Sequence, residues 1–295
     1  MTASLGTSLF PRALETPTIQ YMNMTTSNLV AAVQMVSGPD VAENLRVAAR
    51  LIAKAAAQGA RLVVLPENFA LMGRDEHDKL AVAEEDGRGP IQEFLAEQAR
   101  RHQLWLVGGT VPLRGQEAAR VRSACMLYSE QGERIARYDK IHLFDVEVAE
   151  GEAYRESATL EPGPSEPLVV ETPLGRLGLA ICYDLRFPEL FRAMAGQGMQ
   201  ILALPSAFTA VTGAAHWDVL VRARAIENQC YVIAAGQGGH HASGRDTFGH
   251  SMVVEPWGSV LAVHADGEGV ATASVDLSHL ARVRERFPVL THRRL

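Results

Sequence analysis

Residues 177–190 read Leu177-Gly178-Leu179-Ala180-Ile181-Cys182-Tyr183-Asp184-Leu185-Arg186-Phe187-Pro188-Glu189-Leu190, an apolar run followed by a polar cluster. The apolar run predicts a buried strand, and Pro188 favours the first turn of a helix, where its missing N–H would be unpaired anyway. Cys182 is therefore expected where a strand ends and a helix begins. Backbone N–H groups and the positive end of a helix dipole can favour a thiolate there and can hold an oxyanion. The position predicts a nucleophile, and an inert buried cysteine is the alternative.

Strands alternate with helices over the rest of the chain, as hydrophobic periodicity and turn residues indicate. The expected strands cover 29–35, 61–65, 104–111, 122–129, 133–138, 201–204, 231–235, 251–255, 259–264 and 270–277. The expected helices run from Asp40 to Gly59 and over 90–102, 188–195 and 215–228, while 146–171 and 236–249 are expected to be loops. This alternation predicts the α/β class, and the hairpins within it predict sheets that are not purely parallel.

Length and composition are those of an ordinary globular protein, with 295 residues, of which 47% are hydrophobic and 21% charged. A chain of this length can bury most of its surface in one domain, so residues 28–295 are expected to form a single domain. Residues 1–27 have no periodicity and are expected to form a flexible N-terminal tail.

The formal net charge of -6 argues against nucleic acid or an anionic membrane as the main partner. No apolar run reaches the roughly 18 to 20 residues that span a bilayer. The three cysteines, Cys125, Cys182 and Cys230, are odd in number and lack CxxC spacing. They favour a reducing compartment, and the cytoplasm is the expected location.

Four side chains suited to catalysis lie at or just past the ends of strands: Glu67, Lys140, Glu156 and Cys182. Open α/β sheets place their chemistry at the carboxyl ends of strands. A carboxylate can take the thiol proton, an ammonium can stabilise an oxyanion, and a thiolate can form a thioester that water then cleaves. A cysteine, an acid and a lysine suffice for amide hydrolysis, so no cofactor is expected.

The ten histidines do not predict a metal site. His240 and His241 are adjacent, neighbouring side chains seldom point at one ion, and no HExxH spacing occurs. A papain-like pairing of Cys182 with His142 or His216 as the base stays open, because spacing alone does not exclude it.

Three motifs, in this order along the chain, resemble the carbon–nitrogen hydrolase, or nitrilase, superfamily. They are Leu65-Pro66-Glu67, Asp139-Lys140-Ile141-His142-Leu143-Phe144-Asp145 and residues 181–190. The similarity runs from about Asn28 to Arg294. It implies an αββα sandwich of the nitrilase type with mixed sheets, and association through helical faces into a homodimer or a higher homo-oligomer.

The resemblance also implies roles for the residues of these motifs. Glu67 would be the general base, Lys140 would stabilise the oxyanion and Cys182 would be the nucleophile. Glu156 corresponds to a further glutamate of the family, which orients the lysine and the leaving group. Tyr183 would lend its backbone N–H to the oxyanion hole.

Residues 215–217, 222–228 and 248–254 resemble the Nit branch of this superfamily, which includes amidases of deaminated glutathione and of 2-oxoglutaramate. The stretch 230–237, followed by His240 and His241, looks closer to the former. The implied substrate is glutathione whose amino group has become a keto group, and the implied products are 2-oxoglutarate and cysteinylglycine. The alternatives are an ω-amidase acting on 2-oxoglutaramate, a carbamoylase, a nitrilase, or a binding protein that kept the fold and lost turnover.

Such a substrate is a small amide that carries carboxylates, and Arg186 offers a planar guanidinium for one of them, one helical turn after Cys182. An ion pair of Arg186 with Asp184 or Glu189 is the equally weighted structural alternative. Three further candidates could contact the peptide end of the substrate: Arg245, His240 and His241.

Overall fold

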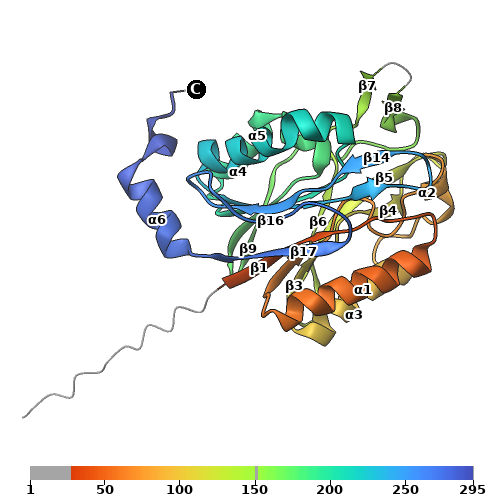
Figure 1. Ribbon diagram of the computed structural model, residues 1–295, viewed down its shortest axis with the longest axis horizontal. Helices are drawn as coiled ribbons and strands as arrows, with labels where there is room; N and C mark the ends of the chain where they lie inside the picture. Colours follow the sequence, from red (N-terminus) through yellow and green to blue (C-terminus); the bar gives the residue numbers. More distant parts are fainter. Residues whose placement is uncertain (1–27, 150–151, 295) are drawn as a thin grey trace, which may run out of the picture.

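The structure, a computed structural model, describes residues 28–149 and 152–294. Two sheets lie face to face, with helices α4 (Pro188–Gly196) and α5 (Ala210–Asn228) over one and α1 (Val41–Ala57) and α3 (Pro90–His102) over the other (Figure 1). The expected αββα sandwich is therefore confirmed. The flexible tail expected at 1–27 lies outside the described residues.

The first sheet has three parallel strands at its centre, to which antiparallel strands are added. Its strands in spatial order are β17 (Gly269–Val275), β1 (Asn28–Gln34), β2 (Leu62–Val64), β3 (Trp105–Val107), β5 (Val121–Tyr128) and β4 (Val111–Arg114), and β6 (Arg134–Asp139) also pairs with β5.

The second sheet is mixed in the same way, with three parallel strands at its centre. Its strands in spatial order are β16 (Val260–His264), β15 (Ser251–Val254), β12 (Tyr231–Gly236), β11 (Ile201–Ser206), β10 (Gly175–Leu179) and β9 (Leu168–Thr172). Both sheets therefore combine parallel and antiparallel pairs, as the hairpins in the sequence predict.

Smaller elements surround the two sheets. They are helices α2 (Asp78–Ala81) and α6 (Leu277–Arg286), the hairpin strands β7 (Asp145–Ala149), β8 (Glu152–Arg155), β13 (Gly238–His240) and β14 (Asp246–Phe248), and the 3-10 turns η1 (Glu156–Ala158), η2 (Cys182–Arg186) and η3 (Val289–His292).

Strand β1 explains how the layers are held together, because both of its faces are apolar and buried. Val30 and Ala32 belong to the core between the two sheets, whereas Ala31 and Val33 belong to the core under α1 and α3. Successive side chains of a strand point to opposite faces, so one apolar run contributes to two layers of core.

The strand expected over 104–111 is interrupted, and the structure has β3 and β4 in its place. Gly108 and Gly109 separate them, and Gly109 has φ +54°, in the left-handed region that glycine enters without strain. The turn brings the hydroxyl of Thr110 to 2.8 Å from the backbone N–H of Asn68. The interruption therefore supports the loop that carries Glu67.

The two expected loops are wrong in part, since the first contains β7, β8 and the start of β9 and the second contains β13 and β14. The hairpin strands are short and partly exposed, so they lack the apolar alternation that predicts a strand.

Helix α6, which follows the last strand, is not predicted from the sequence, because only two of its side chains, Leu280 and Val283, are buried. Helix α5 begins before the expected 215–228, because Thr209 caps it by accepting from the N–H of Thr212.

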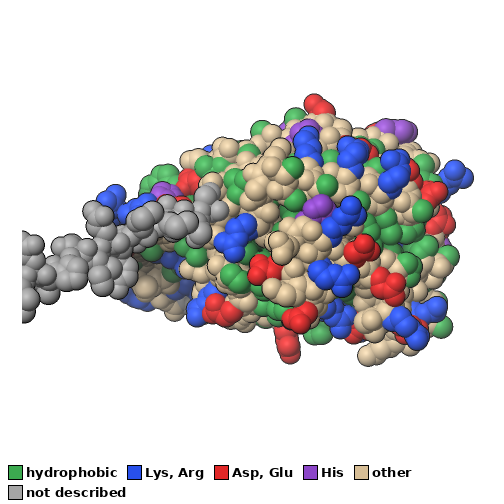
Figure 2. Space-filling view, turned by 90° about the horizontal axis from the view of Figure 1, so that it is seen from below, with side chains coloured by type: hydrophobic (Ala, Val, Ile, Leu, Met, Phe, Trp, Pro, Cys, Tyr) green, Lys and Arg blue, Asp and Glu red, His purple; other side chains and the backbone are tan. Residues whose placement is uncertain are grey.

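The outer face that carries α1 and α3 has side chains of both charges interspersed (Figure 2). Among them, Arg46 pairs with Glu43, and Arg50 with Glu268. Exposed pairs of this kind contribute little to stability and leave this face without a strong field of one sign. No helix among the described residues is both long and apolar enough to cross a membrane.

Gly109→Ala should lower the free energy of unfolding by more than about 1 kcal/mol, because a side chain is strained at this φ and its Cβ would overlap the carbonyl oxygen of Pro66. Urea unfolding followed by circular dichroism measures the change. Gly196→Ala is the matched control, since a Cβ there meets nothing within 4 Å. Equal unfolding midpoints in the two variants would contradict the prediction.

Candidate active site

Cys182 is the first residue of η2, three positions after β10 ends, as the sequence predicts. Its φ is +46°, a left-handed conformation that costs a non-glycine residue about 1–3 kcal/mol. The backbone N–H of Ala207, just after β11, donates to the sulfur at 3.5 Å. The residue is only 7% exposed and lines an internal cavity, so its thiol is largely shielded from bulk water.

Lys140 is a buried ammonium between two carboxylates. It follows β6 directly, and its side chain is 1% exposed. Nζ donates to Oε1 of Glu67 at 2.7 Å and to the two carboxylate oxygens of Glu156 at 3.0 and 2.8 Å. Burial alone would lower the pKa of Lys140, but the charges of Glu156 and Glu67 outweigh burial and raise this pKa well above its usual value. Lys140 is therefore a cation in the resting site.

Glu67 lies just beyond β2 and is held from two sides through its backbone. Its carbonyl accepts from Nε2 of Gln237 at 3.0 Å, and the N–H of the next residue, Asn68, donates to Thr110. The amide of Gln237 is buried and also exchanges hydrogen bonds with Ser37, at 2.8 and 3.0 Å. These contacts fix the position from which the Glu67 carboxylate reaches Lys140.

Glu156 begins η1, directly after the hairpin of β7 and β8. Besides the two contacts with Lys140, its Oε2 accepts from the backbone N–H of Phe144 at 2.8 Å. Burial acts to raise the pKa of Glu156, but Lys140 and this N–H lower it below its usual value. The side chain is therefore an ionised partner that anchors Lys140.

The thiol of Cys182 rests in its neutral form. Burial raises the pKa of Cys182 well above its usual value, the charge of Glu67 raises it further, and the opposing effect of Lys140 is smaller. This corrects the expectation that a helix end favours a thiolate here, since η2 is a short turn that lacks the aligned dipole of a long helix. The proton must leave the sulfur when it attacks, and the Glu67 carboxylate lines the same cavity.

Asp184 ties the turn of Cys182 to the segment of Lys140. Its carboxylate is fully buried and accepts from the hydroxyl of Tyr138 at 2.7 Å and from the N–H of Ile181 at 2.9 Å. Its other oxygen lies 3.1 Å from the backbone nitrogen of His142 and 2.7 Å from Nδ1 of that ring. Tyr138 and His142 flank Lys140, so this one carboxylate sets the position of Lys140 relative to Cys182.

A narrow cavity of about 10 Å³ lies at the sulfur. The structure places seven of the nine sequence-predicted site residues around it: Glu67, Lys140, Glu156, Cys182, Tyr183, Arg186 and Arg245. They follow the ends of β2, β6, β8 and β10, except Arg245, which directly precedes β14, so the cavity lies where strand ends of the two sheets meet.

Arg186 lines this cavity without a carboxylate partner among residues 28–149 and 152–294. The alternative ion pair with Asp184 or Glu189 is not formed, because Asp184 is already occupied by other donors. Nη1 of Arg186 lies 3.3 Å from Nδ1 of His216, and the guanidinium lies 5.3 Å from the ring centre of Phe208. A guanidinium without a carboxylate partner is available to an anionic ligand.

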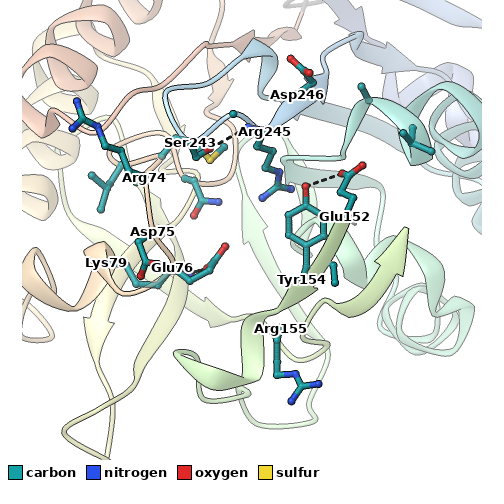
Figure 3. Close-up of a pocket in the computed structure, with 18 residues that line it drawn as sticks. Arg74, Asp75, Glu76, Lys79, Glu152, Tyr154, Arg155, Ser243, Arg245 and Asp246 are labelled. Atoms are coloured by element: carbon teal, nitrogen blue, oxygen red, sulfur yellow. Dashed lines mark hydrogen bonds and ion pairs between the residues drawn. The ribbon is translucent and has the colours of Figure 1, made fainter. Parts of the chain in front are cut away.

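A wide pocket of about 560 Å³ opens beside the narrow cavity. It lies between the segment of Arg74 to Lys79, the hairpin strand that carries Tyr154, and the loop that carries Arg245 (Figure 3). Arg245 lines both spaces and donates from Nη2 to the carbonyl of Ala207. Its guanidinium lies 4.8 Å from the ring centre of Tyr154.

His240 and His241 do not line either space. The side chain of His240 is 71% exposed and lies 2.8 Å from Asp246. His241 is buried, and its two ring nitrogens contact the carbonyl of Ser37 at 2.9 Å and the hydroxyl of Thr247 at 2.7 Å. Both ring nitrogens of His241 already have protein partners. The placement of His240 and His241 therefore gives no support to the expectation that they contact the substrate.

The papain-like alternative also finds no support in the placement of the histidines. His142 contacts Asp184 and stacks on Phe187 at 3.6 Å, and His216 contacts Arg186. Neither ring lines the cavity of Cys182. In the described part of the chain, no group of three or more His, Cys, Asp or Glu residues is arranged to hold a metal ion.

Sequence reasoning missed the positioning residues Gln237 and Asp184. Each is a polar side chain within or directly after an apolar run, a pattern that predicts a buried group with a specific hydrogen-bonding role. The wide pocket was missed as well, because its walls come from segments far apart in the chain.

Asp184→Asn should lower the free energy of unfolding by about 2–4 kcal/mol, because the new NH₂ group would face groups that are themselves donors. The same change should slow turnover by loosening Lys140 relative to Cys182. Urea unfolding and a steady-state amidase assay measure the two effects. Asp218→Asn, at a side chain that is 55% exposed, is the control and should change neither. Native stability in the Asp184 variant would refute this account of its carboxylate.

Comparison with known proteins identifies relatives along most of the chain. The carbon–nitrogen hydrolase family matches residues 29–285. The deaminated glutathione amidase of Synechocystis sp. (strain PCC 6803 / GT-S) is 46% identical over 267 residues, which cover 90% of this chain and 97% of that protein. The deaminated glutathione amidase of Homo sapiens is 45% identical over 269 residues, which cover 90% of this chain and 82% of that protein.

A solved structure agrees with the sequence relatives. The crystal structure of the C. elegans NitFhit protein superposes with a TM-score of 0.85 and 40% identity, and the match covers 90% of this chain and 65% of that one. The resemblance inferred from the three motifs is thereby confirmed, and the chain belongs to the carbon–nitrogen hydrolase family.

Proposed function

We propose that this chain is a cysteine amidase that hydrolyses deaminated glutathione to 2-oxoglutarate and cysteinylglycine. The observation that carries the proposal is the ammonium of Lys140, held between Glu67 and Glu156 in the cavity of Cys182. Two relatives at 45 and 46% identity are both named deaminated glutathione amidase, which supports this choice of substrate.

The first half of the reaction forms a thioester. The sulfur of Cys182 attacks the amide carbon while Glu67 takes the thiol proton. Lys140 and the backbone N–H of Tyr183 stabilise the oxyanion that develops on the carbonyl oxygen. The carbon–nitrogen bond then breaks, Glu67 returns the proton to the leaving nitrogen, and cysteinylglycine departs. Glu156 keeps Lys140 in place throughout.

The second half releases the acid. Glu67 takes a proton from water, the hydroxide oxygen attacks the thioester carbon, and the carbon–sulfur bond breaks. Glu67 gives the proton that it took from water to the departing sulfur, and 2-oxoglutarate leaves. A neutral resting thiol suits this cycle, because Glu67 must be ionised and able to accept a proton at its start.

Arg186 would bind the carboxylate of the 2-oxo acid half. It lines the cavity of Cys182 and has no competing carboxylate in the described part of the chain, and a guanidinium can bind a carboxylate through two parallel hydrogen bonds. This half is shared by deaminated glutathione and 2-oxoglutaramate, so Arg186 does not distinguish the proposed activity from an ω-amidase.

The alternatives use the same four side chains. An ω-amidase, a carbamoylase or a nitrilase would differ in the shape of the space around the substrate, not in Glu67, Lys140, Glu156 and Cys182. The intact set of four weighs against a binding protein that has lost turnover. The wide pocket favours an amide with a large leaving group over 2-oxoglutaramate, which releases only ammonia.

The proposal includes a homodimer and a cytoplasmic location. Val219 and Ile226 lie seven residues apart on α5 and are 65% and 46% exposed, which supports association through this helical face. Cys125, Cys182 and Cys230 are all free, which supports a reducing compartment.

Release of 2-oxoglutarate from deaminated glutathione should exceed release from 2-oxoglutaramate when kcat/KM values are compared. The reason is the room beside the narrow cavity for a dipeptide leaving group. A coupled assay for 2-oxoglutarate measures both, and Cys182→Ala should be inactive on both. Equal or greater kcat/KM on 2-oxoglutaramate would overturn the proposed substrate assignment. Turnover by the Cys182→Ala variant would overturn the proposed mechanism.

Glu67→Gln should lower kcat/KM by about 10²- to 10⁴-fold, because the proton acceptor is lost. It should also make the thiol more acidic, since the charge of Glu67 is one cause of the raised pKa of Cys182. The pH dependence of Cys182 alkylation by iodoacetamide, followed by mass spectrometry, should shift to lower pH. Glu285→Gln serves as the control on a distant carboxylate. A shift of the alkylation profile to higher pH would contradict this description of the site.

A further inference from the structure

The wide pocket next to the catalytic cavity contains one cation whose position sets it apart. Arg245 is half-buried, and its Nε is buried without a hydrogen-bond partner among the described residues. Its guanidinium is anchored at one end to the carbonyl of Ala207 and lies over the ring of Tyr154. A guanidinium placed in this way has donors left for a ligand.

The acidic side chains of the same pocket are already engaged with other partners. Asp75 contacts His77 at 2.6 Å, Glu76 accepts from Lys79 at 2.6 Å, Glu152 accepts from Tyr154 at 2.8 Å, and Asp246 contacts His240 at 2.8 Å. Arg245 forms no ion pair with any carboxylate of residues 28–149 and 152–294. The pocket wall has as many cations as carboxylates, but the guanidinium of Arg245 is not held by a direct ion pair and keeps donors free for a ligand.

Arg245 also lies at the junction through which a leaving group must pass. It lines both the narrow cavity of Cys182 and the wide pocket, and the residue that it contacts, Ala207, donates its N–H to the Cys182 sulfur. The narrow cavity, at about 10 Å³, is too small for a dipeptide, whereas the wide pocket, at about 560 Å³, can hold one. Because Arg186 is assigned to the acyl half, the side of the cavity at Arg245 is left for the amine side of the scissile bond.

We infer that Arg245 binds the terminal carboxylate of a peptide leaving group in the wide pocket. Arg245 thereby selects amides of a peptide over a primary amide, which releases only ammonia. This rests on the proposed function, in which the acyl half is 2-oxoglutaryl. Deaminated glutathione and 2-oxoglutaramate share that half and differ only in the amine, cysteinylglycine or ammonia. The free carboxylate of the dipeptide is the group that matches an unpaired guanidinium.

The test compares Arg245→Gln with the wild-type protein on three amides. These are deaminated glutathione, 2-oxoglutaramate, and deaminated glutathione whose glycine carboxylate is replaced by a neutral carboxamide. The variant should lose about 10- to 100-fold in kcat/KM on deaminated glutathione and change by less than about twofold on 2-oxoglutaramate. The carboxamide should be a poor substrate of the wild-type protein. The Arg245→Gln variant should hydrolyse the carboxamide as fast as the wild-type protein does.

Arg155→Gln is the matched control, because it removes the same charge from the rim of the same pocket. Figure 3 shows the Arg155 guanidinium on the far side of Tyr154 from Arg245. This variant should keep the wild-type order of the three substrates. Arg186→Gln, at the acyl half, should instead lower kcat/KM on all three alike.

The outcomes separate this inference from the proposed function. An equal loss on all three amides in Arg245→Gln would show that the residue only supports the loop around Ala207, and would overturn the inference. An unchanged preference for deaminated glutathione would overturn it as well. If the wild-type protein hydrolysed neither deaminated glutathione nor its carboxamide, the proposed function itself would fail. Activity of the variant on 2-oxoglutaramate shows that its catalytic cavity is intact.

Discussion

The buried ammonium of Lys140 is the interaction on which the rest of the site depends. A charge that leaves water is costly unless opposite charges and hydrogen bonds replace the solvent, and here Glu67 and Glu156 do so. One carboxylate would neutralise Lys140, and the second leaves a net negative charge near Cys182. That charge, together with burial, keeps the thiol protonated. The nucleophile is thus stored in a neutral form, beside the group that can deprotonate it.

The scaffold holds these groups by their backbones and through buried polar side chains. Gln237, at the end of β12 in the second sheet, binds the carbonyl of Glu67 beyond β2 in the first. Asp184, beside Cys182, binds both sides of the segment that contains Lys140. Each contact joins one sheet to the other, so the sandwich itself sets the distances between the reacting groups. The substrate side is less enclosed, where the guanidinium of Arg245 faces a wide pocket.

Much of the candidate site could be predicted because local sequence carries it. Glu67, Lys140 and Cys182 each follow a strand, and the motifs around them are specific enough to indicate the family. The histidines were harder to place from sequence, since His241 lies close in the chain to Arg245 but turns inward to Ser37 and Thr247. Whether a side chain faces a cavity or the core depends on packing partners that are distant in sequence.

The sequence by itself determined the α/β class, the mixed sheets and the residue types available for chemistry, because strand periodicity, turn residues and the proline after Cys182 act over a few positions. Only the tertiary structure decided the protonation state of the thiol and the partners of Lys140. Both depend on burial and on charges that approach from both sheets, and Coulomb interactions depend on distance in space, not on separation along the chain.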